Sequence, residues 1–220
     1  MSHQIAIDGP AGAGKSTIAK IVSKKLGFIY VDTGAMYRTM ALYLSRLSVD
    51  PDNMEEIGDK AQSAEITIKY IDGEQVVMLG DENVNGLIRS PEVSAMASKT
   101  SQVARLRTKL VELQQKLSET ENVVMDGRDI GTVVLPNADL KIYLTASVQV
   151  RAQRRYKEMI EKGQEAVLSD IEKDIEERDY RDMHRVASPL MQAEDAVLVD
   201  TSNMSIEEVA DKIIELYNNK

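Results

Sequence analysis

Short apolar runs alternate with longer segments of helical spacing along most of the chain. Each run has a length that suits a buried strand, and the five clearest lie at residues 5–7, 28–31, 123–125, 140–144 and 197–199. Because strands that are separated by helices usually join a parallel sheet, this pattern predicts an α/β fold. We expect a five-stranded parallel sheet with helices on both of its faces.

Two of the expected helices carry signals of their own. One apolar face runs along residues 105–120, and its members are Leu106, Leu110, Leu113 and Leu117. Near the C-terminus, Ser205 stands three residues before Glu208, which is the spacing of a capping box, and an apolar stripe follows it. We therefore expect a core-facing helix at 105–120 and a capped helix that begins after Ser205.

The pattern changes between residues 65 and 85. The letters EITIKYI, EQVVML and ENV indicate three short strands, which are separated by Asp72-Gly73 and Gly80-Asp81. Two-residue turns that contain glycine are typical of hairpins, so this stretch predicts a small antiparallel sheet. Because the sheet interrupts the α/β alternation, we expect residues from about 35 to 103 to form an inserted subdomain.

Length, charge and the lack of cysteine narrow the possible classes. The 220 residues suffice for one compact domain with a small insert, and 27 basic against 36 acidic residues leave a net charge of −9. That charge disfavours non-specific binding to nucleic acid or anionic lipid. Without cysteine there are no disulfides and no thiol catalysis. With no long apolar segment and no signal-peptide pattern, we expect a cytoplasmic monomer without nucleic-acid or membrane partners.

The letters GPAGAGKS follow the first expected strand, open a helix and satisfy the phosphate-binding pattern GxxxxGK[ST]. In this motif backbone N–H groups and the helix N-terminus hold phosphate oxygens, Lys15 reaches the β- and γ-phosphates, and Ser16 offers a hydroxyl to Mg²⁺. A glycine-rich turn without a ligand is the alternative. The residues expected to bind ATP are Gly9, Pro10, Ala11, Gly12, Ala13, Gly14, Lys15, Ser16 and Thr17.

A second constellation is VVMDGRD, which places Asp126 at the carboxyl end of a buried strand. Ligands of α/β proteins bind at that edge of the sheet, so Asp126 could hold Mg²⁺ together with Ser16. An ordinary helix or turn cap after the strand is the alternative. Gly127 would let the chain turn, so that Arg128 and Asp129 point into the same cleft.

The segment 148–187 is unusually charged. Gly163 separates two helical patterns in it, and Ser169, three residues before Glu172, predicts the start of the second helix. Its arginines are Arg151, Arg154, Arg155, Arg178, Arg181 and Arg185. In a net-acidic chain this concentration favours a mobile helical lid that clamps a transferring phosphoryl group and excludes water. The alternative is a solvated face with ion pairs such as Glu177 with Arg181.

Five stretches together resemble the bacterial cytidylate kinase family of nucleoside monophosphate kinases: IDGPAGAGKST, YVDTGAMYR, SPEVSAMASKTSQVARLR, MDGRDIGTVVLPNADLKIYL and ERDYRDMHRVASPL. The resemblance covers almost the whole chain. It implies transfer of the γ-phosphoryl group of ATP, with Mg²⁺, to CMP or dCMP in pyrimidine nucleotide metabolism. It also implies a core of residues 1–34, 104–150 and 186–220, an enlarged monophosphate-binding insert at about 35–103, and a lid at about 151–185.

The same resemblance implies roles for single residues. Arg38 and Arg128 would grip the 5′-phosphate of the acceptor, and Tyr37 would shape the same pocket. Thr33 would also bind the substrate. Cytosine would be read by Ser98, Arg107 and Asp129, with Ser101 as the alternative to Ser98. The pentose and phosphates would meet Arg178, Asp182 and Arg185, and the donor would face Arg154 or Arg155.

The chemistry of the acceptor agrees with these roles. Cytosine presents acceptors at O2 and N3 beside an amino donor, which an arginine and a carboxylate complement, whereas uracil reverses two of these groups. A monophosphate needs no general base, because its second pKa of about 6 leaves the attacking oxygen largely ionised at neutral pH. Catalysis would then rest on charge stabilisation by Lys15, Arg128, Arg178 and Arg185.

Other functions fit parts of the sequence. A kinase of UMP, of a deoxynucleoside or of shikimate would use the same phosphate-binding loop, and the last two would need Asp32 as a general base. Asp32 could instead cap the helix that begins near Gly34. A nucleotide-dependent switch or an RNA-binding protein are the alternatives from other classes, but the acceptor-binding residues argue against the first and the net charge against the second.

Overall fold

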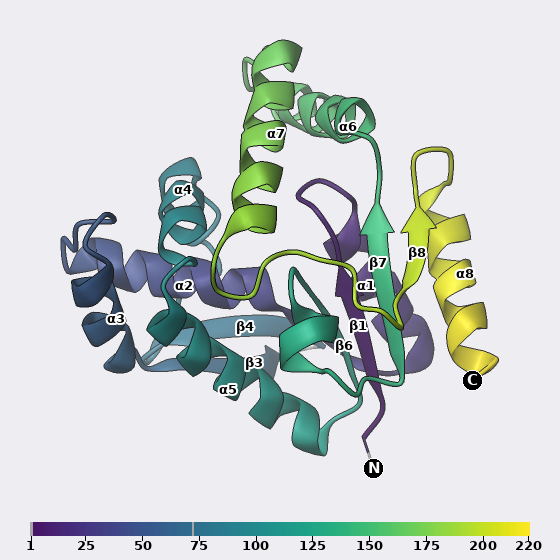
Figure 1. Ribbon diagram of the computed structural model, residues 1–220, viewed down its shortest axis with the longest axis horizontal. Coiled ribbons are helices and arrows are strands. Elements are labelled where there is room, and N and C mark those ends of the chain that lie inside the picture. Colours follow the sequence, from purple (N-terminus) through teal and green to yellow (C-terminus); the bar gives the residue numbers. More distant parts are fainter. Residues whose placement is uncertain (1, 72) are drawn as a thin grey trace.

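The computed structural model describes residues 2–71 and 73–220 and shows an α/β fold around a five-stranded sheet (Figure 1). The strands lie in the order β2-β6-β1-β7-β8, and every pairing is parallel. Their bounds are β1 (Gln4–Asp8), β2 (Ile29–Asp32), β6 (Val123–Gly127), β7 (Leu140–Thr145) and β8 (Val197–Asp200). The expectation of a five-stranded parallel sheet is confirmed, and each apolar run forms one of its strands.

Helices cover both faces of this sheet. One face packs against α1 (Lys15–Leu26) and α8 (Ile206–Asn218), and the other against α5 (Ala104–Thr120) and a π-helical turn, η1 (Ile130–Val134). Along β1, Ile5 and Ile7 belong to the first apolar cluster and Ala6 to the second, since successive side chains of a strand point to opposite faces. Burial on both faces explains why the strands read as continuous apolar runs.

The capped C-terminal helix is also confirmed. The Ser205 hydroxyl accepts from the Glu208 N–H, and the Glu208 carboxylate accepts from the Ser205 N–H, so both halves of the capping box are present at the start of α8. Val209 and Ile213 on its inner face are fully buried. The helix at 105–120 begins one residue earlier than expected, and Leu106 and Leu110 lie in the core.

The residues between β2 and α5 form α2 (Thr33–Arg46), α3 (Met54–Gln62), α4 (Pro91–Thr100) and a three-stranded antiparallel sheet. The strands of this small sheet are β3 (Ile66–Ile71), β4 (Glu74–Leu79) and β5 (Glu82–Asn83). The expected antiparallel meander is therefore confirmed. Asp72, the first residue of the expected hairpin turn, lies outside the described residues. An apolar cluster separate from those of the large sheet fills the space between these elements and α5.

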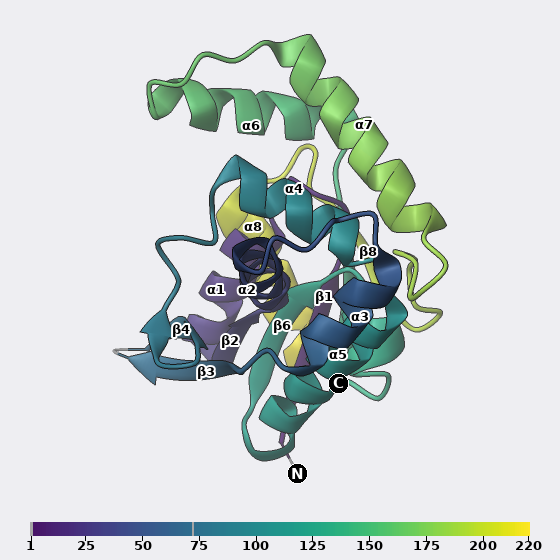
Figure 2. The ribbon, with the colours of Figure 1, turned by 90° about the vertical axis from the view of Figure 1, so that its left-hand side faces the viewer.

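Two helices, α6 (Val148–Glu161) and α7 (Leu168–His184), lie beyond the carboxyl ends of β1 and β7 (Figures 1 and 2). The break at Gly163, which has a φ of 71°, is confirmed. The second helix, α7, begins at Leu168, one residue before the predicted start. Ser169 is not its cap, because Val167 holds the N-cap position and makes no side-chain capping bond. Ile171 and Ile175 of α7 pack on Ala152 of α6, and this burial outweighs the capping preference.

No helix in the described part of the chain is long and apolar enough to cross a bilayer.

Gly9, at the exit from β1, has no room for a side chain. A Cβ atom there would lie 1.9 Å from the Leu144 carbonyl oxygen, and φ is +148°. We expect Gly9→Ala to lower the free energy of unfolding by about 3 kcal/mol, because backbone must move to relieve the overlap. Denaturant unfolding measures this loss.

Gly14 provides the control for that substitution. It also has a positive φ of 89°, but a Cβ there would meet nothing within 4 Å. Gly14→Ala should therefore cost only the left-handed backbone conformation, about 1 kcal/mol. Equal losses in the two variants would contradict the close approach of Gly9 to β7.

Candidate active site

The phosphate-binding motif forms the loop between β1 and the first turn of α1. Its residues 9–14 leave the central strand of the sheet, and α1 begins at Lys15. The Lys15 ammonium is buried and donates to the Pro10 carbonyl at 2.8 Å. Burial lowers the pKa of Lys15 to about 7, and the positive charge of Arg128 adds to the effect. The unpaired N–H groups that begin α1 and this lysine make the loop suitable for an anion.

Asp126 lies beside this loop at the carboxyl end of β6. The Ser16 hydroxyl donates to its Oδ2 at 2.9 Å, and the Tyr30 hydroxyl donates to its Oδ1 at 2.8 Å. Asp126 therefore caps no helix, and the capping alternative is wrong. Burial raises the pKa of Asp126, and the nearby charge of Asp32 adds to this. A hydroxyl and a carboxylate that share one point at a phosphate site are oxygen ligands of the kind that Mg²⁺ uses with phosphates.

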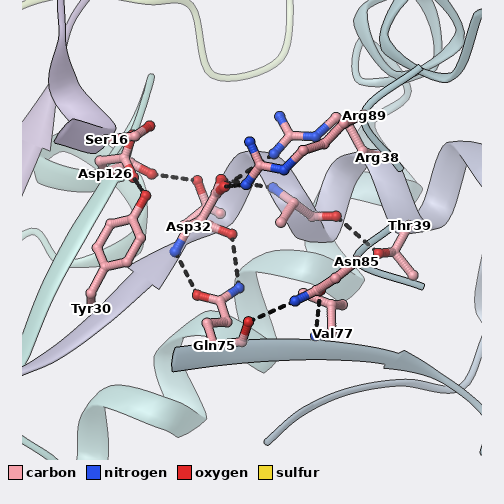
Figure 3. A network of polar contacts seen from close by, with 12 residues as sticks. Ser16, Tyr30, Asp32, Arg38, Thr39, Gln75, Val77, Asn85, Arg89 and Asp126 are labelled. Carbon is pink, nitrogen blue, oxygen red and sulfur yellow. Dashed lines mark hydrogen bonds and ion pairs between the residues drawn. The ribbon is translucent and has the colours of Figure 1, made fainter. Parts of the chain in front are cut away.

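Asp32, at the end of β2, is engaged through both carboxylate oxygens (Figure 3). Oδ1 accepts from the Ala35 N–H at 2.8 Å and so caps α2, which confirms the capping interpretation of this residue. Oδ2 pairs with Arg38 at 3.1 Å and with Arg89 at 3.7 Å. A Cβ on Gly34 would lie 3.0 Å from the Arg38 guanidinium, so glycine permits this close pairing. Arg89 was not singled out in the sequence, because it belongs to no motif.

A buried ion pair joins Arg107 of α5 to Asp129, which follows β6. Their closest N···O distance is 2.5 Å, and each side chain is about 5% exposed or less. Arg107 also donates to the Ser101 carbonyl at 3.1 Å and lies over the Tyr37 ring. Arg185 approaches the other Asp129 oxygen at 3.7 Å. Three segments that are distant in sequence therefore bring their charges to one buried point.

Buried polar atoms without partners are concentrated in residues of the candidate site. Nine buried side-chain nitrogen or oxygen atoms in the described ranges, 2–71 and 73–220, make no hydrogen bond. Six of them belong to residues expected at the site: Tyr37, Arg38, Ser98, Arg107, Arg178 and Arg185. Because a buried polar group without a partner costs free energy, such a concentration indicates a site whose ligand supplies the missing partners.

The structure also separates the two candidate serines. Ser98 Oγ is one of these unpartnered atoms, whereas the Ser101 hydroxyl donates to the Ser98 carbonyl at 3.0 Å. The Ser101 carbonyl in turn accepts from Arg107. The Ser98 hydroxyl is thus buried without a partner, while the Ser101 hydroxyl is used within the protein. The role of Ser98 in binding a base stays a prediction.

The arginines of the charged segment do not act as one group. Arg178 is half-buried, and desolvation together with the charge of Arg128 lowers its pKa to about 10. Arg128 binds Asp182 at 2.8 Å, and Arg185 lies 3.9 Å from the same residue. Although burial opposes ionisation of Asp182, the charge of Arg128 holds its pKa below the usual range.

Arg181 is different, because it is exposed and approaches Glu177 at 4.0 Å. The solvated-face alternative is thus correct for Arg181, and the expectation that it joins Arg178 and Arg185 in the site is wrong. Because α7 ends at His184, Arg185 reaches Asp129 from beyond the helix, whereas Arg181 lies on an exposed face of the helix beside Glu177.

The remaining expected residues donate hydrogen bonds to main-chain carbonyls or lie at the surface. Arg154 donates to the Thr201 carbonyl at 2.8 Å, after β8, and Arg155 is exposed. The Thr33 hydroxyl donates to the Asp126 carbonyl at 2.7 Å, which ties α2 to β6. Arg151 is buried, donates to the Ala11 carbonyl at 2.9 Å and pairs with Asp179 at 2.6 Å. It therefore connects the phosphate-binding loop with both α6 and α7.

Asp8 is a residue that the sequence analysis missed. Its two carboxylate oxygens accept from the Ile130 and Gly131 N–H groups at 2.8 and 2.7 Å, which fixes the turn that follows Arg128 and Asp129. Burial raises the pKa of Asp8 to about 6 against the lowering effect of these bonds. Its position at the end of β1, directly before the first motif glycine, was the available signal.

Comparisons with known proteins agree with this geometry. The model of a family described as cytidylate kinase matches residues 5–219. A cytidylate kinase of Desulfitobacterium hafniense is 50% identical over 217 residues, covering 99% of this chain and 93% of its own. A cytidylate kinase of Caldicellulosiruptor saccharolyticus is 48% identical over 213 residues, covering 97% and 94%.

Among solved structures, shikimate kinase from Acinetobacter baumannii in complex with shikimate resembles the chain with a TM-score of 0.51. The identity is 17%, and the match covers 100% of this chain and 94% of that one, so the likeness concerns the fold alone. The family match and the two relatives span nearly the entire length of the chain. The chain therefore belongs to the cytidylate kinase family.

Proposed function

We propose that this chain transfers the γ-phosphoryl group of ATP to CMP or dCMP and releases ADP with CDP or dCDP. The observation that carries the proposal is the buried Arg107–Asp129 pair, at which Arg107, Tyr37 and Arg185 each leave a polar atom without a partner. A nucleotide-binding loop alone would fit many enzymes. A second cluster of buried polar groups without partners supports transfer to an acceptor.

The Arg107–Asp129 pair is chemically suited to cytosine. Asp129 can accept a hydrogen bond from the 4-amino group, and the unpartnered Arg107 Nε–H can donate to the acceptors at N3 or O2. The free hydroxyl of Ser98 adds a further donor or acceptor. Uracil would place O4 against the Asp129 carboxylate and N3–H against Arg107, and buried mismatches of this kind cost roughly 1–3 kcal/mol each. We infer partial rather than complete exclusion of UMP.

The 5′-phosphate of the acceptor would lie among Arg38, Arg128 and Arg89, between Asp32 and the phosphate-binding loop. Its attacking oxygen is already largely ionised at neutral pH, so no general base is needed. Asp32 is committed to the Ala35 N–H and to Arg38, which gives no support to a role as the base of a hydroxyl kinase. Lys15, Arg128, Arg178 and Arg185 would stabilise the charge that develops during transfer.

The oxygens of Ser16 and Asp126 would hold Mg²⁺ together with the phosphates of ATP. When bound, the ion would neutralise phosphate charge and fix the geometry of the donor. Within the protein, Tyr30 orients the Asp126 carboxylate through its own hydrogen bond. Arg154 or Arg155 would face the donor on the side of β8.

We also propose the division into a core (1–34, 104–150 and 186–220), an insert (about 35–103) and a lid (about 151–185). The separate apolar clusters of the large sheet, of the insert and of the α6–α7 pair support it. Closure of the lid would bring Arg178 and Arg185 onto the transferring group and exclude water. The monomeric state and the cytoplasmic location stay predictions.

The experiment that tests the function is ADP formation by the purified protein with Mg-ATP and a panel of acceptors. We expect rapid turnover with CMP and dCMP, much slower turnover with UMP, and none above background with AMP, shikimate or no acceptor. Turnover mainly with another acceptor would reject the base-reading assignment. If no acceptor increased ADP formation, a nucleotide-controlled binding protein would replace the kinase.

Base recognition by Asp129 predicts a change in the preference between substrates. Asp129→Ala should lower the ratio of kcat/KM for CMP to that for UMP by roughly ten- to hundredfold, because only cytosine loses a hydrogen bond. The ratio is insensitive to partial unfolding, since both substrates report on the same folded fraction. Asp52→Ala, which removes an exposed carboxylate paired with Lys99, is the control. An unchanged ratio in Asp129→Ala would reject Asp129 as a base reader.

The lowered pKa of Lys15 predicts that ATP binding takes up a proton. Without ligand Lys15 titrates near pH 7, and bound phosphates would favour its charged form, so its pKa rises on binding. We expect uptake of about one proton per ATP at pH 8.5 and little at pH 6, measured by calorimetry in buffers of different ionisation enthalpy. At pH 8.5 the phosphates are already ionised and release none.

Lys15→Met should bind ATP without this uptake, and Lys24→Met, on the exposed side of α1, should retain it. Proton uptake of equal size in Lys15→Met would assign the effect to another group.

A further inference from the structure

The edge of the large sheet at β2 is closed by side chains of the small sheet. β2 is the outermost strand and pairs only with β6 in the described part of the sheet. On its other edge, Tyr30 and Asp32 have backbone groups that meet no strand. The Tyr70 hydroxyl donates to the Tyr30 carbonyl at 3.2 Å. The Gln75 amide accepts from the Asp32 N–H at 2.7 Å and donates to the Asp32 carbonyl at 3.2 Å.

Tyr70 and Gln75 reach this edge as a pair. They lie directly opposite each other in the β3–β4 register, so their side chains project from the same face of the small sheet. Asn85 holds the backbone of β4 directly after the Gln75 side chain, because its amide donates to the Gln75 carbonyl at 2.8 Å and accepts from the Val77 N–H at 3.0 Å (Figure 3). The Gln75 side chain therefore starts from a fixed point in β4.

Tyr70 and Gln75 contact Tyr30 and Asp32, and both of these residues bond to side chains of the candidate active site. Asp32 caps α2 with one oxygen and pairs with Arg38 and Arg89 through the other. Tyr30 donates its hydroxyl to Asp126. A small shift of the β2 edge would move the Asp32 carboxylate and, with it, Arg38, whose Nε has no partner within the protein. Figure 3 shows the continuous path from Asn85 through Gln75 and Asp32 to the two arginines.

We propose that Gln75 is a positioning residue for the acceptor phosphate: its amide fixes the main chain of Asp32, and Asp32 in turn orients the guanidinium of Arg38. This inference rests on the proposed function, in which Arg38 grips the 5′-phosphate. Glutamine suits the role because its amide carries an acceptor oxygen and a donor nitrogen side by side, which match the N–H and the carbonyl of Asp32. Glutamate lacks the donor and would add a charge beside Asp32, and methionine of similar length can make neither bond.

The test compares Gln75→Met and Gln75→Glu with the unaltered chain and with the control Gln62→Met. Gln62 lies at the end of α3, donates to the Gly58 and Arg105 carbonyls, and does not contact β2. Dissociation constants for CMP and ATP would be measured by calorimetry, and that for cytidine by competition. All measurements would be made at a temperature below the melting temperature of the least stable variant. Steady-state KM and kcat would be measured with CMP.

We expect both Gln75 variants to bind CMP about tenfold more weakly and to raise its KM similarly, while cytidine and ATP affinities change less than twofold. Cytidine lacks the phosphate, so it separates phosphate positioning from general damage to the pocket. Equal weakening of CMP and cytidine, or unchanged CMP affinity, would overturn the proposal. Failure of the proposed function would appear separately, as a lack of CMP turnover in the unaltered chain and in Gln62→Met.

Discussion

The parallel pairing of β1 between β6 and β7 is the constraint on which the rest of the site depends. Because parallel strands end at the same edge of the sheet, β1 delivers the phosphate-binding loop, β6 delivers Asp126 and the turn that carries Asp129, and β2 delivers Asp32. Gly9 approaches the Leu144 carbonyl so closely that the start of the loop has no room for a side chain there. Asp8 adds a bond from the last residue of β1 to the turn after β6. The groups proposed to bind the donor and the acceptor are thus attached to one edge of the sheet.

A second theme is the concentration of charge at buried positions. Removing a charge from water costs several kcal/mol unless a partner compensates for it, and here Arg107, Arg128, Asp129 and Asp182 compensate one another in pairs. The pairing is incomplete, since several guanidinium and hydroxyl atoms lack hydrogen-bond partners. A phosphorylated nucleoside would offer both the anionic charge and the acceptors that these atoms need. The lowered pKa of Lys15 and the raised pKa of Asp126 have burial as their main cause.

The small antiparallel sheet and the α6–α7 pair contact the large sheet from different sides, as Figures 1 and 2 show. The small sheet contacts it through Tyr70 and Gln75, which hydrogen-bond to the main chain of β2. The α6–α7 pair contacts it through Arg151, which binds the Ala11 carbonyl, and through the bond between Asp182 and Arg128. Each of these two parts is joined to the large sheet by hydrogen bonds close to the residues proposed to bind ligand. A ligand bound there would therefore be close to both parts.

The sequence by itself determined the elements that depend on near neighbours. The apolar runs predicted the five strands, the glycine pattern predicted the phosphate-binding loop, and the spacing of Ser205 and Glu208 predicted the cap of α8, because in each case the interacting residues lie within a few positions. The roles of Arg107 and Asp129 in reading the base were predicted only through resemblance to a family. Ser169 was predicted to start the helix α7 but does not cap it, and Ile171, two residues further along, is buried against α6. Tertiary structure alone decided that Gln75 holds Asp32, 43 residues away, and that Arg151 holds Ala11. Both bonds end on main-chain atoms, which every residue type possesses, so no pattern of side chains could mark them.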